Sequence, residues 1–117
     1  MQISRAVPDI QTDRIEESRS FYADLLGFEV AMDMGWIVNL RSPDAPTAQI
    51  QLLTADATAA VTPQVTVEVG DVDEMHRRMV EAGHEILHPL TEEPWGVRRF
   101  FVREPSGAVV NVMGHSR

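Results

Sequence analysis

The sequence contains no cysteine. This absence excludes a disulfide framework, a thiol nucleophile and any metal site built from cysteine, and it suits the reducing cytoplasm, where we expect the protein to reside. No apolar run approaches the roughly 18 residues that a membrane-spanning helix requires. The first residues, Met1 to Arg5, lack the apolar core of a signal peptide. We therefore expect a soluble cytoplasmic protein.

Basic residues are few: 10 arginines and lysines stand against 18 acidic residues, for a net charge of −8. A surface of this sign repels phosphate backbones and anionic lipid. Nucleic acid and membrane are therefore not expected as partners. A small-molecule ligand, cationic or aromatic, is compatible with this charge, although acidity also simply keeps a protein soluble.

The 117 residues suit one domain. Two segments of the chain carry start and stop signals for helices. The segments 13–26 and 71–82 each open with Asp followed three residues later by Glu, which is a capping-box pattern. They end at Gly27 and Gly83, because glycine adopts the left-handed conformation that stops a helix. Apolar residues at helical spacing predict one buried face on each helix: Phe21, Tyr22, Leu25 and Leu26 in the first, and Val72, Met75 and Met79 in the second.

Period-two alternation of apolar and polar residues predicts strands in the rest of the chain. The order strand, helix, three strands occurs twice, and the segment 39–44 parallels the segment 101–106 at the same place after each helix. We therefore predict two βαβββ modules, residues 1–56 and 63–117, joined by a linker over residues 57–62.

Five segments resemble the signatures of a known superfamily. The first helix carries Ser-x-x-Phe-Tyr-x-x-x-Leu-Gly-Phe at 18–28, and the second begins Val-x-Asp-Val-Asp at 69–73 and ends Ala-Gly at 82–83. The last hairpin carries Pro-Trp-Gly-Val-Arg-Arg-Phe at 94–100 and Arg-Glu-Pro-Ser-Gly at 103–107. In this order, on an internal repeat, they resemble the vicinal oxygen chelate superfamily of glyoxalases, bleomycin-resistance proteins and dioxygenases. The segment 94–98 is most similar to the bleomycin-resistance branch.

The resemblance implies an α+β fold in which two tandem βαβββ modules form a curved mixed sheet with a concave binding groove. It also implies a homodimer. Enzymes of the superfamily hold one divalent metal on the concave face through His, Gln or Glu side chains of the first and last strands of each module. The repeat places those four positions at Val7, Gln51, Gln64 and Asn111.

None of these four residues is His, Asp or Glu, and divalent cations need anionic or imidazole ligands to offset lost hydration. We therefore predict no catalytic metal, no cofactor and no catalytic residue. Of the four histidines, His115 is the one that the last strand could bring to the groove.

Strand parity places a set of amides with a few apolar walls on the concave face, which suits a polar organic ligand. Trp36 and Trp95 are either stacking surfaces for an aromatic ligand or packing residues. The predicted function is metal-free sequestration of a small organic molecule, such as an antibiotic or another natural product. The alternative is a metal-dependent glyoxalase-like lyase, isomerase or dioxygenase. The predicted ligand-binding residues are Trp36, Asn39, Gln51, Gln64, Glu68, Trp95, Arg99, Phe101 and Asn111.

Overall fold

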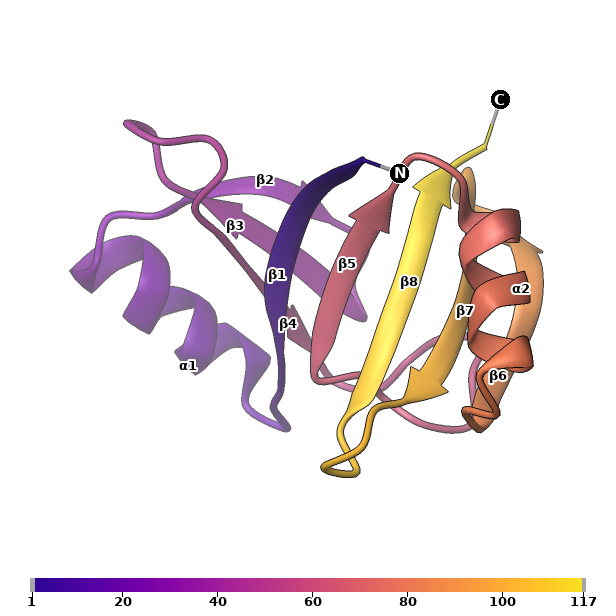
Figure 1. The fold of residues 1–117 in the computed structure, drawn as a ribbon. Coiled ribbons are helices and arrows are strands. Elements are labelled where there is room, and N and C mark those ends of the chain that lie inside the picture. Colours follow the sequence, from indigo (N-terminus) through magenta and orange to yellow (C-terminus); the bar gives the residue numbers. More distant parts are fainter. Residues whose placement is uncertain (1, 117) are drawn as a thin grey trace. The chain divides into compact units, whose positions relative to one another are not determined.

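The protein is an α+β chain in which the order strand, helix, three strands occurs twice (Figure 1), as predicted; a computed structural model describes residues 2–116. The first set is β1 (Ile3–Gln11), α1 (Ile15–Ser20) continued by the π-helical turn η1 (Phe21–Leu25), β2 (Glu29–Asp33), β3 (Ile37–Arg41) and β4 (Gln49–Leu53). The second set is β5 (Val65–Val69), α2 (Val72–Glu81), β6 (Ile86–Glu93), β7 (Val97–Arg103) and β8 (Val109–His115).

The chain divides into two compact units. The described residues of unit 1 are 2–6 and 63–116, and those of unit 2 are 7–62. The units follow contacts in space, whereas the predicted modules follow the sequence repeat, so the module boundaries and the linker stay a prediction. Within the described residues, neither helix is long and apolar enough to cross a membrane.

Unit 2 contains a mixed four-stranded sheet in the order β2-β3-β4-β1. Strand β1 pairs with β4 in parallel, and the other neighbours are antiparallel. Apolar residues on one side of the sheet form the core with the helical segment, since side chains alternate between the faces of a strand. The buried centre of this core is Val38, Leu40 and Leu52, packed by Ile10, Ile15, Tyr22, Phe28 and Ile50.

Unit 1 repeats this arrangement in the order β5-β8-β7-β6, with β5 and β8 parallel. Helix α2 begins as predicted, because the Asp71 carboxylate accepts a hydrogen bond from the backbone N–H of Glu74 at 3.1 Å. It ends at Glu81, and Gly83, whose φ of 83° lies in the left-handed region, stops it from continuing. Its apolar side packs on a core of Val69, Val72, Phe100, Val102 and Val112, with Met75 and Met79.

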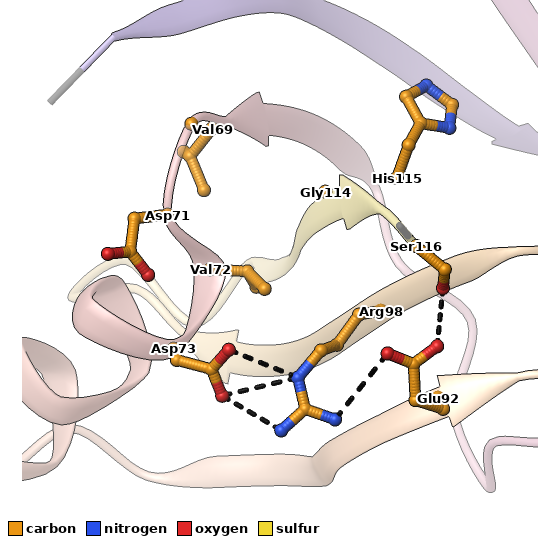
Figure 2. A pocket seen from close by; sticks show the side chains of 10 residues that line it. Val69, Asp71, Val72, Asp73, Glu92, Arg98, Gly114, His115 and Ser116 are labelled. Atoms are coloured by element: carbon orange, nitrogen blue, oxygen red, sulfur yellow. Dashed lines mark hydrogen bonds and ion pairs between the residues drawn. The ribbon is translucent and has the colours of Figure 1, made fainter.

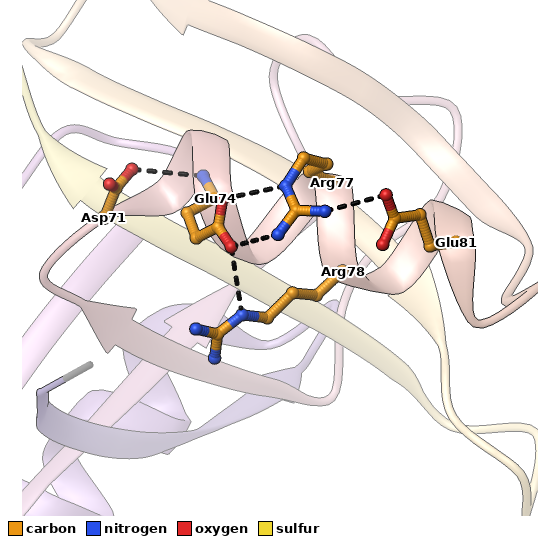
Figure 3. Close-up of polar contacts among 5 residues, drawn as sticks. All are labelled: Asp71, Glu74, Arg77, Arg78 and Glu81. Atoms are coloured by element: carbon orange, nitrogen blue, oxygen red, sulfur yellow. Dashed lines mark hydrogen bonds and ion pairs between the residues drawn. The ribbon is translucent and has the colours of Figure 1, made fainter.

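The exposed side of α2 carries a network of ion pairs (Figure 3). Arg77 bridges Glu74 and Glu81, and Arg78 also donates to Glu74 at 3.2 Å. The hydrogen bonds from Arg77, followed by that from Arg78, lower the pKa of Glu74 to about 2. This face is therefore covered by paired charges, as is usual for a helix surface that faces water.

The first helix departs from the prediction in two ways. Asp13 does not cap it: the N-cap is Arg14 with no side-chain cap, and the backbone N–H of Arg14 instead donates to Thr12 Oγ1 at 3.0 Å. The predicted buried stripe is also wrong, because Phe21, Leu25 and Leu26 are exposed and only Tyr22 of the four packs on the core. The cause is the π turn, in which Leu26 N–H bonds to Phe21 C=O and the wider turn rotates the residues that follow away from α-helical phase.

Candidate functional site

The polar face of unit 1 is the side of its sheet opposite α2, where β5, β8, β7 and β6 place polar side chains. Thr66 on β5, Asn111 on β8 and Phe101 on β7 lie opposite one another in one row across the sheet. Met113 and Arg99 form the next row together with Glu68. The sheet therefore brings the predicted residues Glu68, Arg99, Phe101 and Asn111 onto one face.

Asn111 lies in the middle of this polar face and is 7% exposed. Its amide nitrogen donates to Thr66 Oγ1 at 3.2 Å. Its carbonyl oxygen, Oδ1, is buried without a hydrogen-bond partner, and no other described side-chain atom shares this state. Burying an unpaired acceptor costs about 1–3 kcal/mol. An N–H or O–H donor that reached Asn111 Oδ1 would remove this cost.

A buried charge cluster lies beside this row. Arg99 Nε donates to Glu93 Oε2 at 2.6 Å, and His88 Nε2 lies 3.1 Å from the same oxygen. The side chains of Arg99 and Glu93 are only 4% and 2% exposed. The carboxylate therefore fixes the position of the guanidinium and offsets its charge where water cannot.

Sequence reasoning missed both Glu93 and His88. Strand β6 runs from Ile86 to Glu93 and carries both residues. The pairing of β6 with β7 also shifts register between Ile86 and His88, and again between His88 and Thr91. These irregularities break simple alternation, so parity alone does not assign both residues to the polar face. The one signal available was the run of polar residues just before the Pro-Trp-Gly turn.

Two aromatic rings enclose the Arg99 guanidinium. Its carbon lies 5.0 Å from the ring centre of Trp95 and 4.7 Å from that of Phe101. At these distances cation–π attraction stabilises the guanidinium beside the rings. Trp95, predicted as a stacking surface or a packing residue, therefore contacts Arg99 of the charge cluster.

Glu68 lies on β5, in the same row as Met113 and Arg99. Arg5 Nε donates to its carboxylate at 2.8 Å, and the exposed His115 places Nε2 3.4 Å from the same oxygen. Gln64 behaves differently from the prediction for it as a groove residue: it is exposed, and its Oε1 accepts from the backbone N–H of Val109 at 2.5 Å. Gln64 therefore caps the start of β8 and does not join Asn111.

The polar face of unit 2 is the side of its sheet opposite α1. Asp9, Gln51 and Asn39 lie in one row across β1, β4 and β3, and each is 7% exposed. Gln51 Nε2 donates to Asp9 Oδ1 at 2.8 Å, and Asn39 Nδ2 donates to Gln49 Oε1 at 3.2 Å. Trp36 precedes β3 and is half-buried. Amides and one carboxylate thus line this face.

The four positions implied for a metal do not form a donor set. The side chain of Val7 is fully buried and has no donor atom for a metal. The side-chain oxygen of Gln64 accepts a backbone hydrogen bond, and the amide nitrogen of Gln51 donates to Asp9. The residue opposite Gln51 is Asp9, and that opposite Asn111 is Thr66. Within residues 2–116, no three His, Asp or Glu side chains gather as a metal site would require. The residues present therefore do not fit a divalent metal.

A separate cavity of about 500 Å³ lies in unit 1 near the start of α2 (Figure 2). Arg98 stands between two carboxylates there, donating to Asp73 at 2.8 Å and lying 3.8 Å from Glu92. The hydrogen bond from Arg98 lowers the pKa of Asp73. Since Arg98 alternates with Arg99 along β7, it projects from the opposite side of the sheet, and this cavity is not part of the polar face.

The fold and its amide-lined faces define a protein built on a βαβββ repeat whose sheets present polar surfaces opposite their helices. Residues 2–112 match the Glyoxalase/Bleomycin resistance protein/Dioxygenase superfamily. The chain belongs to this superfamily. No curated protein matches the chain closely enough to report.

Solved structures share the fold at low sequence identity. A glyoxalase/bleomycin resistance protein/dioxygenase superfamily member from Vibrio splendidus 12B01 is 23% identical to this chain, with a TM-score of 0.72. The match covers 97% of this chain and 99% of the Vibrio chain. Methylmalonyl-CoA epimerase from Mycobacterium tuberculosis is 18% identical over 98% of this chain and 88% of its own, with a TM-score of 0.68. The Mn(II)-bound glyoxalase from Novosphingobium aromaticivorans is 22% identical over 99% of this chain and 38% of its own, with a TM-score of 0.65.

Proposed function

We propose that this protein binds a small organic molecule and withholds it without breaking a bond, as a protein of the bleomycin-resistance branch would. The ligand class is an antibiotic or another natural product. The observation that carries the proposal is Asn111, whose buried carbonyl oxygen lacks a hydrogen-bond partner on the polar face of unit 1. A ligand N–H or O–H that reached this oxygen would remove its unfavourable burial.

The chemistry of both polar faces supports a ligand that is polar and aromatic or cationic. Amides offer donors and acceptors without charge, and they recur on both units at Asn39, Gln51 and Asn111. Asp9 adds a carboxylate that attracts a cationic group, whereas Glu68 is already paired with Arg5. On the polar face of unit 1, the half-buried ring of Trp95 adds apolar surface beside Arg99.

The competing function is a metal-dependent lyase, isomerase or dioxygenase, since structures of the same fold include an epimerase and a Mn(II)-bound glyoxalase. The residues at the four positions argue against a metal enzyme, because they are one valine and three neutral amides. Stoichiometric Zn, Ni, Fe or Mn in protein purified without added metal would favour the enzyme.

The proposed assembly is a cytoplasmic homodimer. Strand β2 is an edge of the sheet of unit 2, and β6 is an edge of the sheet of unit 1. Edge strands present unpaired backbone groups that a second copy can satisfy. The net charge of −8 supports the exclusion of nucleic acid and anionic membrane as partners. Analytical ultracentrifugation measures the assembly directly.

The test of binding is a titration of the protein with bleomycin-like glycopeptides and aromatic polyketides, followed by tryptophan fluorescence. We expect saturable binding of at least one compound. Asn111→Leu removes the acceptor at similar volume and should weaken that binding roughly tenfold to a hundredfold, which corresponds to about 1–3 kcal/mol. The control Glu85→Gln alters an exposed residue of the same unit and should bind normally. Failure across the whole panel would overturn the proposal.

A further inference from the structure

The outer side of the first helical segment is apolar, although it faces water. Phe21 is 51% exposed, Leu25 is 78% exposed and Leu26 is 59% exposed. We call these three residues the helix-1 patch. Large apolar side chains usually point inward from a surface helix, and contiguous ones that do not are a sign of an interaction site.

Helix α2 is the internal comparison, since it occupies the same place in the repeat. Its exposed side carries Glu74, Arg77, Arg78 and Glu81 in ion pairs (Figure 3). Val80 is its one exposed large apolar residue. The same architecture therefore tolerates a charged outer surface, and the apolar surface of α1 and η1 is not a requirement of the fold.

The central ring of the patch is held in place from behind. Phe21 meets Tyr22 edge to face, with ring centres 5.1 Å apart, and Tyr22 meets Phe28 in the same way at 6.2 Å. Tyr22 and Phe28 pack on the buried core of unit 2. Phe21 is thus a pre-positioned aromatic anchor, the kind of residue that dominates binding energy at protein interfaces.

The surroundings of the patch are acidic. A shallow hollow of about 600 Å³ is lined by Phe21 and Leu25 together with Ser20 and three acidic residues, Glu16, Glu17 and Asp24. The nearby arginines are occupied, because Arg14 pairs with Glu17 and Arg19 pairs with Asp33 at 2.6 Å. Within the described residues, Glu16 and Asp24 have no ion-pair partner, so their charges face an incoming partner unneutralised.

We propose that the helix-1 patch docks the apolar side of a basic amphipathic helix from a partner protein, a function beyond the binding of a small molecule. Apolar side chains of that helix would cover Phe21 and Leu25, and its Lys or Arg residues would meet Glu16 and Asp24. A second copy does not fit, since patch against patch would oppose acidic residues with acidic residues. An anionic membrane is repelled by the same charges.

The probe is a synthetic helical peptide of leucine and lysine with leucine at the i, i+3, i+4 and i+7 positions, compared with the same peptide carrying glutamate in place of lysine. Binding is measured by fluorescence anisotropy and mapped by amide chemical shifts of the isotopically labelled full chain. We expect the lysine peptide to bind, the glutamate peptide not to bind, and the shifts to concentrate at residues 16–26 rather than 74–81.

Phe21→Ser and, separately, Leu25→Ser should each weaken binding of the lysine peptide at least tenfold. The matched control Val80→Ser should leave that binding unchanged. Leu25 is the more exposed residue, so its variant keeps the test valid if Phe21→Ser unfolds. Asp24→Asn should weaken binding and reduce its salt dependence. The proposal would be overturned if Val80→Ser lost as much affinity for the lysine peptide as the patch variants do. It would also be overturned if the glutamate peptide bound as well as the lysine peptide, or if Leu25→Ser changed the oligomeric state.

Discussion

Replacement of Glu93 by glutamine tests the buried charge cluster on the polar face of unit 1. The variant keeps the shape of the side chain but removes the charge that faces the Arg99 guanidinium at 2.6 Å. Both side chains are almost fully buried, so water does not replace the lost charge. Leaving one member of a buried ion pair uncompensated costs about 3–5 kcal/mol, and because the amide oxygen is retained the expected loss is about 3 kcal/mol.

The neighbouring residue supplies the control. Glu92 is 56% exposed and lies 3.8 Å from Arg98, so Glu92→Gln should change the free energy of unfolding by less than about 1 kcal/mol. In urea denaturation followed by circular dichroism, a slope of about 1.5 kcal/mol/M converts the loss in Glu93→Gln to a midpoint roughly 2 M lower. If the midpoints for Glu93→Gln and Glu92→Gln agree within error, the buried pair of Glu93 and Arg99 does not stabilise the fold and the prediction is refuted.

Three further predictions concern local structure. Asp71→Ala should cost about 1 kcal/mol in urea denaturation because it removes the cap of α2, whereas Asp13→Ala should change stability by less than about 0.5 kcal/mol because Asp13 caps nothing. Gly27→Ala should destabilise by roughly 1–2 kcal/mol because φ is 95° there, and Gly70→Ala, at a site with no contact under 3.8 Å, should be tolerated better; thermal unfolding ranks the two. The pKa of Glu74 is lowered in the folded state to about 2 from an ordinary 4.5, so its ion pairs stabilise the protein fully above that ordinary value and lose their effect as pH falls toward 2. The destabilisation caused by Glu74→Gln should therefore be largest near neutral pH and fade over this window, and a constant difference down to pH 2 would contradict the assignment.

Much of the fold follows from local sequence rules that the tertiary structure leaves intact. Asp71 caps its helix and Gly83 ends it, because both features depend on a few adjacent residues. Alternation along β7 and β8 places Arg99, Phe101 and Asn111 on one face, since regular antiparallel pairing preserves parity. The superfamily resemblance was likewise confirmed.

The remaining features depend on irregular backbone that alternation and helical periodicity do not encode. A π turn changes which of Phe21, Tyr22 and Leu25 points inward, so the predicted buried stripe failed. Two register shifts in β6 bring His88 and Glu93 to Arg99, so the charge cluster was not foreseen.

The central claim is that the polar face of unit 1 binds an organic molecule without a metal. Its most direct test is a titration of protein whose metal content has been measured, in the presence and absence of a chelator such as EDTA. We predict substoichiometric metal, saturable quenching of tryptophan fluorescence that the chelator does not change, and weaker binding by Asn111→Leu. Stoichiometric bound metal, or binding that EDTA abolishes, would contradict the claim.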